Sequence, residues 1–215
     1  MDSKTEVLAD KEFKKFLEPY KTQLDKEMNE IIGIAPVNMP VHAPESLLSN
    51  FTADAFRQVA SAYLKSPVDI AIVNLKGLRT QIPAGEITVS KVFELMPFEN
   101  ELVLLWLKGS DLNDLLQFFA SIGGEGVSGL KMGIKNGKAV DVRVGGKPVD
   151  PAKDYIIATN DYLAEGNDGM SQLAKNDKRI DTGMKIREML IDYIKNETSK
   201  GHKIESKRDG RIIQY

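Results

Sequence analysis

Two segments near the N-terminus carry apolar residues at helical spacing. The first, 10–33, is interrupted by Pro19, and its apolar positions are Phe13, Phe16, Leu17, Tyr20, Leu24, Met28 and Ile31. The second, 44–66, has on one face Leu48, Phe51, Ala55, Val59 and Tyr63. Apolar residues that recur every three or four positions are typical of a helix with one buried face. The sequence therefore predicts two helices, the first bent or split at Pro19 and stopping at Gly33.

Continuous apolar runs later in the chain predict strands. The runs 67–75, 101–109 and 154–160 have no regular polar alternation, which is expected when a strand is covered on both faces. Two-residue turn signals at Asn136–Gly137 and Gly145–Gly146 predict hairpins between further, shorter strands.

Two further segments, 109–123 and 182–201, predict helices by the same spacing rule. Helices and strands follow one another without a regular βαβ period. The sequence therefore predicts one layered domain of mixed α/β (α+β) class, in which helices flank a mixed sheet. Three prolines between 36 and 44 mark the one candidate boundary. Residues 1–43 are expected to form a helix and connector packed on the domain of residues 44–215.

Composition and charge narrow the class of protein. The chain of 215 residues is 42% hydrophobic and 28% charged, which is typical of a soluble globular protein. Its 29 basic and 31 acidic residues leave a formal charge of -2, which gives no support for nucleic-acid binding. No apolar run approaches the roughly 20 residues of a membrane helix. The polar start lacks the apolar core of an export signal, so the protein is either cytosolic or begins after a removed signal.

The residues needed for autonomous catalysis are scarce. The chain has no cysteine, and its two histidines, His42 and His202, are far apart without acidic ligands at metal-binding spacing. Phosphate-binding and dinucleotide-binding glycine motifs and the serine-nucleophile motif are absent. We therefore expect no metal, no cofactor and no catalytic residue in this chain, and the pattern favours binding over catalysis.

Two loops combine an aromatic residue with polar neighbours at the end of a predicted element. In "ELMPFENELVL", Phe98 and Asn100 lie between a helix and a strand. In "ATNDYLAEGNDGM", Tyr162 follows a buried strand and precedes an acidic loop bounded by glycines.

An ordered set of motifs resembles the C-terminal domain of 5'-nucleotidases over about residues 44–201. The motifs are "PESLLSNFTADAF", "VDIAIVNLKGLR", "IPAGEITVSKVFELMPFENELVLLWLKGSDLNDLL", "VSGLKM" and "GKPVDPAKDYIIATNDYLAEGNDGM". The resemblance implies a mixed α/β domain that holds the nucleoside of the substrate. In that family a separate metallophosphatase domain with two divalent metals does the chemistry, in the periplasm or outside the cell. The resemblance therefore implies a periplasmic or extracellular protein whose export signal has been removed.

The same resemblance implies roles in binding the base and the ribose. "PFEN" is similar to the family's Pro-Phe-Gly-Asn, so Phe98 would be one of two rings that clamp the base and Asn100 would hydrogen-bond its edge. "YLAEGNDG" is similar to the family's aromatic followed by Gly-Gly-Asp-Gly. Tyr162 would then be the second ring and Asp168 the acceptor for ribose hydroxyls, which would make the two loops halves of one site.

A phosphate-binding turn is implied at "NLKGLR", where the family has Asn-Gly-Gly-Gly-Ile-Arg. Asn74 and Gly77 keep the family residues, and Arg79 would bind phosphate. Leu75 and Lys76 replace two of the glycines, so their side chains crowd the phosphate or Lys76 supplies a charge. Two further phosphate-binding arginines of the family have no counterpart in "NMPVHAPES".

Each of these residues also has a purely structural interpretation. Phe98 after a proline suits a core position, and Tyr162 suits a half-buried loop aromatic. Asp168 between glycines suits a turn, and Asn100 suits a cap or turn. Arg79 could instead form a solvated ion pair with Glu94 or Glu99, of little energetic weight.

The sequence thus predicts a nucleoside- or nucleotide-recognition domain of a 5'-nucleotidase-type nucleotide hydrolase. The two-metal phosphatase domain would be supplied by another chain or a missing segment, and this chain alone is expected to be inactive. The predicted partners are a nucleoside or nucleotide and that metallophosphatase domain, without nucleic acid or a membrane span. The alternative is a structural or partner-docking domain that kept the fold and lost ligand binding.

Overall fold

The computed structural model describes the backbone of residues 3–215, and the side chains of residue 13 and residues 15–215. The first half of the chain contains α1 (Ser3–Met28), β1 (Ile31–Ala35), α2 (Leu47–Leu64), β2 (Ile70–Val73), η1 (Leu75–Gly77), β3 (Gly85–Thr88), α3 (Val89–Leu95), β4 (Glu101–Lys108) and α4 (Gly109–Ser121). The second half contains β5 (Gly126–Ser128), β6 (Leu130–Lys135), β7 (Lys138–Val144), β8 (Lys147–Pro148), β9 (Asp154–Asn160), α5 (Asp161–Ala164), η2 (Asn167–Gly169), η3 (Ser171–Lys175), β10 (Lys178–Lys185), α6 (Ile186–Ser199) and β11 (Ile212–Gln214).

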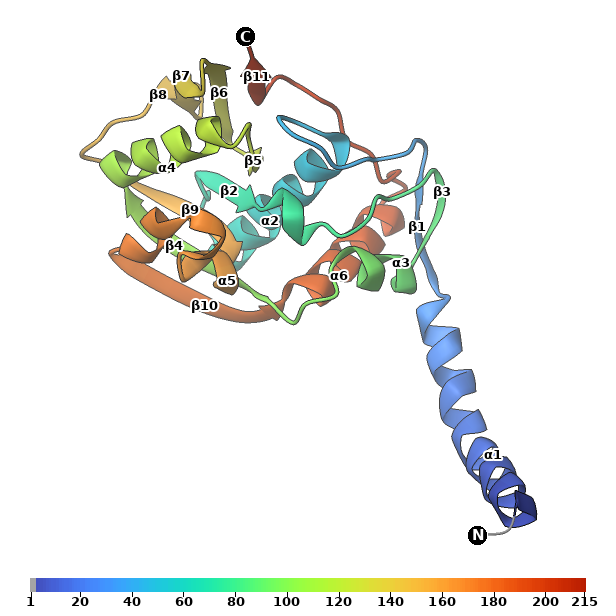
Figure 1. The fold of residues 1–215 in the computed structure, drawn as a ribbon. Helices are drawn as coiled ribbons and strands as arrows, with labels where there is room; N and C mark the ends of the chain where they lie inside the picture. The colour runs from blue at the N-terminus through green and yellow to red at the C-terminus, as the bar shows by residue number, and fades with distance from the viewer. Residues whose placement is uncertain (1–2) are drawn as a thin grey trace.

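A five-stranded sheet with the order β10-β4-β9-β2-β5 forms the centre of the fold. Strands β2 and β9 are parallel, and the other neighbours in this sheet are antiparallel. Helices α2 and α6 contribute to the core on one face, whereas α4 and the second sheet contribute to the core on the other face (Figure 1). The predicted mixed α/β class with flanking helices is confirmed.

Strand β4 shows why the central strands are apolar along their whole length. Leu102 and Leu104 belong to the core beneath α2 and α6, whereas Val103 and Leu105 belong to the core beneath α4. Side chains alternate between the two faces of a strand, so a strand with a core on each side has no polar face. The three predicted strands at 67–75, 101–109 and 154–160 correspond to β2, β4 and β9.

A second sheet, with the order β11-β6-β7-β8, contains both predicted hairpins. Asn136 and Gly137 have φ of 52° and 71°, and Gly145 and Gly146 have φ of 56° and 80°. Two successive residues with positive φ are what a type I′ turn requires, and such turns match the twist of the strands that they join. The C-terminal strand β11 lies parallel to β6 in this sheet.

The N-terminal helix differs from the prediction in its end point. Helix α1 runs through Pro19 without a break and ends at Met28, so it is not split and does not stop at Gly33. Gly33 lies instead in β1, where an added Cβ would stand 2.9 Å from side-chain atoms of Ile194 and Ile204. Gly33 therefore permits close packing against α6 and the C-terminal tail. From the sequence alone, the same glycine indicates the end of a helix.

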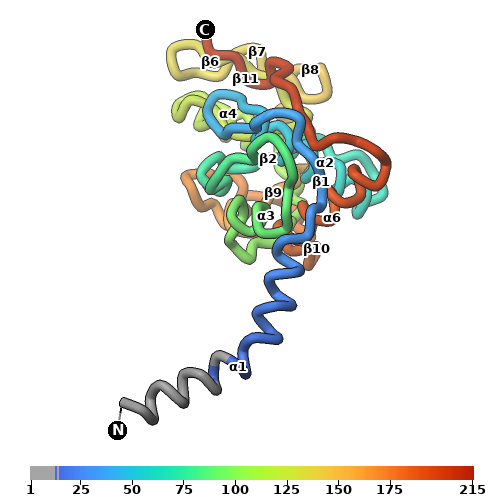
Figure 2. The backbone as a smooth tube through the Cα atoms, turned by 90° about the vertical axis from the view of Figure 1, so that its right-hand side faces the viewer, coloured from blue at the N-terminus to red at the C-terminus, as the bar shows by residue number. Residues whose placement is uncertain are grey.

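The two parts of segment 1–43 have different environments. The connector is packed on the domain: Ile32 is 3% exposed and Met39 is fully buried. Helix α1 projects away from the domain (Figures 1 and 2), and along its described part Phe16 and Tyr20 are exposed. The packing of this helix on the domain stays a prediction. Among the described residues, no helix has the length and apolar character needed to cross a membrane.

Candidate functional site

Three loops meet at one edge of the central sheet. The 74–79 loop follows β2 and the 160–170 loop follows β9, and because these strands are parallel and adjacent, their carboxyl ends share this edge. Strand β4 is antiparallel to β9, with Leu102 opposite Asn160, so the 96–100 loop that precedes β4 also ends there. The carboxyl edge of such a sheet is where ligands commonly bind.

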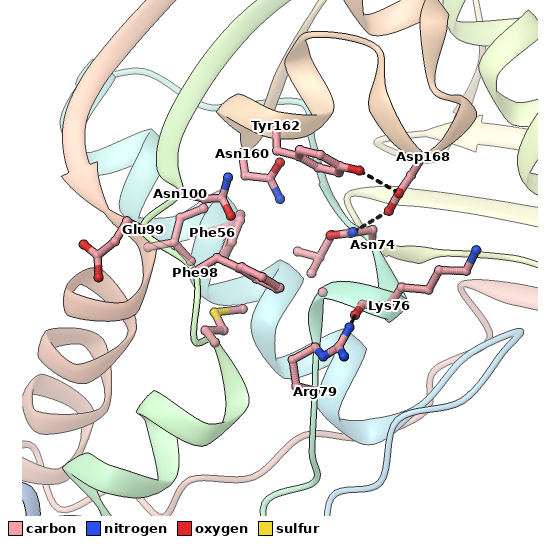
Figure 3. A pocket seen from close by; sticks show the side chains of 14 residues that line it. Phe56, Asn74, Lys76, Arg79, Phe98, Glu99, Asn100, Asn160, Tyr162 and Asp168 are labelled. Carbon is pink, nitrogen blue, oxygen red and sulfur yellow. Dashed lines mark hydrogen bonds between the residues drawn. The ribbon is translucent and has the colours of Figure 1, made fainter.

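The three loops enclose a cavity of about 620 Å³ (Figure 3). It is lined by Phe56, Val73, Asn74, Lys76, Gly77, Arg79, Met96, Phe98, Glu99, Asn100, Asn160, Tyr162, Asp168 and Ile186. Every site residue predicted from the sequence is in this set, so the structure brings them together. The remaining lining residues that the sequence did not single out are mostly apolar: Phe56, Val73, Met96, Ile186 and the polar Asn160.

Phe98 and Tyr162 reach the cavity from different loops. Phe98 comes from the loop before β4, and Tyr162 is the second residue of α5, after β9 (Figure 3). Their residues are 52% and 43% exposed, which rules out a core position for either ring. Large apolar surface left exposed in a concave site is available for a ligand.

Asn100 connects the two aromatic-bearing loops. Its Nδ2 donates to Oδ1 of Asp161 at 2.7 Å, and the same oxygen accepts from the backbone N–H of Tyr162 at 2.8 Å. The amide group of Asn100 therefore sets the spacing between the loops. The side-chain oxygen Oδ1 of Asn100 has no hydrogen bond within the described residues, so it retains an acceptor for a ligand.

Asp168 lies at the opposite end of the cavity from Asn100 (Figure 3). Its Oδ1 accepts from the Tyr162 hydroxyl at 3.1 Å, and its Oδ2 accepts from Asn74 Nδ2 at 2.7 Å. The hydrogen bond to Asp168, together with the negative charge of that carboxylate, raises the pKa of Tyr162. A carboxylate offers about four lone-pair sites, so Asp168 retains capacity for ligand hydroxyls.

Backbone geometry explains two glycines of this site. Gly169 has φ of 82°, in the left-handed region that glycine adopts at little cost. Asp168, just before it, also has a positive φ, of 53°, which costs energy for most residues. At Gly77, an added Cβ would stand 2.5 Å from Oδ1 of Asn74. Gly77 therefore allows Asn74 to take the position from which it binds Asp168.

Two cationic side chains, Lys76 and Arg79, line the cavity at the 74–79 loop. Nη1 of Arg79 lies 3.5 Å from the Lys76 carbonyl oxygen. The alternative ion pair of Arg79 with a glutamate is not seen, since Glu94 pairs with Lys91 and Glu99 pairs with Arg187. Within the described residues, neither cation of this loop has a carboxylate at ion-pair distance.

Comparison with known proteins identifies the fold and its family. The family model described as "5'-nucleotidase, C-terminal domain" matches residues 29–175. The chain belongs to this family. The predicted family is thereby confirmed, and the cavity lies within a 5'-nucleotidase C-terminal domain.

Individual relatives agree with this assignment. The 5'-nucleotidase of Vibrio vulnificus is 26% identical over 200 residues, which cover 90% of this chain and 36% of the relative. The crystal structure of a 5'-nucleotidase precursor from Thermus thermophilus matches with a TM-score of 0.78 and 30% identity, over 94% of this chain and 42% of that one. NAD nucleotidase of Haemophilus influenzae shares the fold, with a TM-score of 0.65 and 24% identity over 100% of this chain and 42% of that one. The chain thus spans about a third of the length of the Vibrio relative.

A buried carboxyl group that the sequence did not reveal contacts the 74–79 loop of this 5'-nucleotidase C-terminal domain. Glu125 is 7% exposed, and its Oε2 accepts from the backbone N–H of Leu75 at 2.7 Å. Burial raises the pKa of Glu125 to about 7, and the nearby charge of Asp168 adds to this effect. Glu125 therefore holds the start of the turn that carries Lys76 and Gly77. A glutamate between two glycines gives no signal of such a role in the sequence.

The described part of the chain contains no group of three or more His, Asp or Glu side chains arranged to hold a metal ion. The side chains that line the cavity are suited to binding an aromatic, hydroxylated and anionic ligand.

Proposed function

We propose that this domain recognises a nucleoside or nucleotide for a 5'-nucleotidase-type hydrolase. The observation that carries the proposal is the pair of exposed rings, Phe98 and Tyr162, which enter one cavity from two loops. The Asn100–Asp161 hydrogen bond joins the two loops that carry these rings. A base that enters between the rings stacks on both of them, and any base offers such a face.

The polar groups around the rings suit the rest of a nucleotide. Asp168 accepts from ribose hydroxyls, because a carboxylate forms strong, charge-assisted hydrogen bonds with such donors. Asn100 reads the edge of the base through its carbonyl oxygen. Lys76 and Arg79 bind phosphate, and Arg79 does so with the forked geometry of a guanidinium. Lys76 takes over a part of the role that the arginines missing from "NMPVHAPES" have in the family.

Hydrolysis, in this proposal, takes place on a metallophosphatase domain or chain that carries the divalent metals. The Vibrio relative, named 5'-nucleotidase, is almost three times as long as the part that this chain matches. The assembled enzyme acts on nucleotides in the periplasm or outside the cell, in nucleotide catabolism. The chain alone binds its ligand without hydrolysing it.

Calorimetric titration of the chain with adenosine, uridine, AMP and UDP-glucose tests the proposal. We expect at least one of the four to bind, and Phe98→Ala or Tyr162→Ala to weaken that binding. Loss of one stacked ring costs about 1–3 kcal/mol, which corresponds to a roughly 5- to 150-fold rise in Kd. Tyr63→Ala is the matched control, because Tyr63 is 46% exposed on α2 and does not line the cavity.

Two results would count against the proposal. Equal losses of affinity in Tyr63→Ala and in the ring variants would show that binding does not depend on the clamp. Absence of heat with all four ligands would instead favour a domain that has kept the fold as a docking surface for a partner.

A further inference from the structure

One buried cation, Arg187, binds the backbone around Phe98. Arg187 is the second residue of α6, and its side chain is 9% exposed. Its Nη1 lies 3.5 Å from the carbonyl oxygen of Met96 and 3.3 Å from that of Pro97. Its Nη2 forms an ion pair with the Glu99 carboxylate. A single guanidinium therefore contacts the loop on both sides of Phe98.

The loop needs such contacts because it has no regular pairing of its own. It lies between the end of α3 and the start of β4, outside any helix or strand. The junction between β10 and α6 supplies two further bonds: the N–H of Ile186 donates to the backbone carbonyl of Asn100 at 2.9 Å, and Lys185 Nζ donates to the Glu99 carbonyl at 3.1 Å. The conformation of the loop thus depends on α6.

Arg187 is itself held in one orientation. Its Cζ lies 4.1 Å from the centre of the Phe93 ring, so the guanidinium stacks on α3 while it binds the loop. A planar guanidinium presents its donors in a fixed fork, and a lysine cannot make the same set of contacts from one position. Phe98, by contrast, is about half exposed, so packing against neighbours does not fix its ring.

We propose that Arg187 is a positioning residue for base binding, which holds the 96–100 loop so that Phe98 is already placed to stack on a base. The inference rests on the proposed function and extends it to a residue outside the family match, which ends at residue 175. Ordering a loop at the moment of binding costs affinity, so holding it in advance increases affinity. Arg187 touches the ligand only through Phe98.

Backbone NMR relaxation tests the first part of the inference without any ligand. Order parameters of the Phe98 and Glu99 amides are expected to be about 0.85 in the wild type and to fall below about 0.6 in Arg187→Met. Arg211→Met is the matched control. The side chain of Arg211 is 10% exposed and binds backbone carbonyls and Asp54, none of which lines the cavity. The control should leave both order parameters unchanged.

A double-mutant cycle tests the second part with the tightest binder among adenosine, uridine, AMP and UDP-glucose. Arg187→Met is expected to raise Kd roughly tenfold in the wild-type background, where Phe98 is present. In the Phe98→Ala background it should raise Kd by less than about twofold, because the ring through which Arg187 acts is gone. A general loss of structure would instead weaken binding equally in both backgrounds.

A further variant, Glu99→Gln, covers the case in which Arg187→Met does not fold. The Glu99 side chain is 64% exposed, so the substitution removes the ion pair without leaving a buried gap. Glu99→Gln should lower the order parameters of the same two amides, to a smaller extent. It should also raise Kd when Phe98 is present and have less effect on Kd in the Phe98→Ala background. Unchanged order parameters in folded Arg187→Met and Glu99→Gln would overturn the inference, as would additive losses in the cycle. Absence of nucleotide binding by the wild type would overturn the proposed function, a result that differs from unchanged order parameters.

Discussion

Replacing Glu125 by glutamine is expected to change how the stability of the domain depends on pH. Glu125 is 7% exposed, and burial raises its pKa from 4.5 to about 7 in the folded chain. Between pH 4.5 and pH 7, the folded chain keeps this proton while the unfolded chain releases it. The unfolded state then binds fewer protons, so the free energy of unfolding falls as pH rises through this window.

The size of this effect follows from the difference between the two pKa values. Each pH unit between them corresponds to 1.36 kcal/mol, so the interval from 4.5 to about 7 corresponds to about 3 kcal/mol. This loss of unfolding free energy, which comes from ionising the buried Glu125, is absent below pH 4.5 and complete above pH 7. Glu125→Gln is neutral at every pH, and its side-chain oxygen can still accept from the Leu75 N–H, so it escapes the penalty.

Urea unfolding of both proteins at a series of pH values from 4 to 8, followed by Trp106 fluorescence, measures the difference directly. All other groups titrate in both proteins, so the difference in unfolding free energy isolates Glu125. As the pH rises from 4 to 8, we expect the free energy of unfolding of Glu125→Gln to increase by up to about 3 kcal/mol relative to that of the wild type. The gain should persist in 1 M salt, because desolvation is its main cause and salt screens only charge interactions. A difference that stays constant with pH, or that moves in favour of the wild type, would refute the reasoning.

Two further predictions concern close backbone packing and the contact between the loops. Gly109→Ala should lower the free energy of unfolding by about 2–4 kcal/mol in urea titrations, because the new Cβ would stand 2.0 Å from the Asp150 carbonyl oxygen. A loss below about 0.5 kcal/mol would contradict the close packing at this turn. Asn100→Ala should raise the Kd of the most tightly bound nucleotide roughly tenfold in calorimetry, since it removes the hydrogen bond to Asp161 that joins the two aromatic-bearing loops. Asn176→Ala, outside the cavity, is the control, and equal effects of the two substitutions would contradict this role of Asn100.

The central strands and the site loops were predictable because each has a strong local signal. Strands β4 and β9 are continuous apolar runs, and the aromatic residues at their ends interrupt the polar composition expected of a loop. Phe98 and Tyr162 line one cavity because these two strands pair in antiparallel orientation. The sequence contains both residues but not their pairing, so their meeting could only be inferred from the resemblance.

Strand β10 (Lys178–Lys185) shows where local signals fail. The sequence predicts a helix that begins at residue 182, whereas the last four residues of β10 are still strand. The strand lies at the edge of the sheet and carries polar residues through its length, so it has no continuous apolar run that would predict it. Glu125 and Arg187 were missed for a related reason. Charged residues in a glycine turn or at the start of an amphipathic helix are usually solvated, and only tertiary packing buries these two.

The bonds that shape the cavity join segments that are distant in the chain. Asn100 and Asp161 are 61 residues apart, Asn74 and Asp168 are 94 apart, and Arg187 and Pro97 are 90 apart. Each fixes a loop that has little regular structure, and each depends on the central sheet to bring its partners together. The shape of the cavity is therefore a property of the complete sheet together with α6. The family match alone does not contain it, because the match ends before β10 and α6 begin.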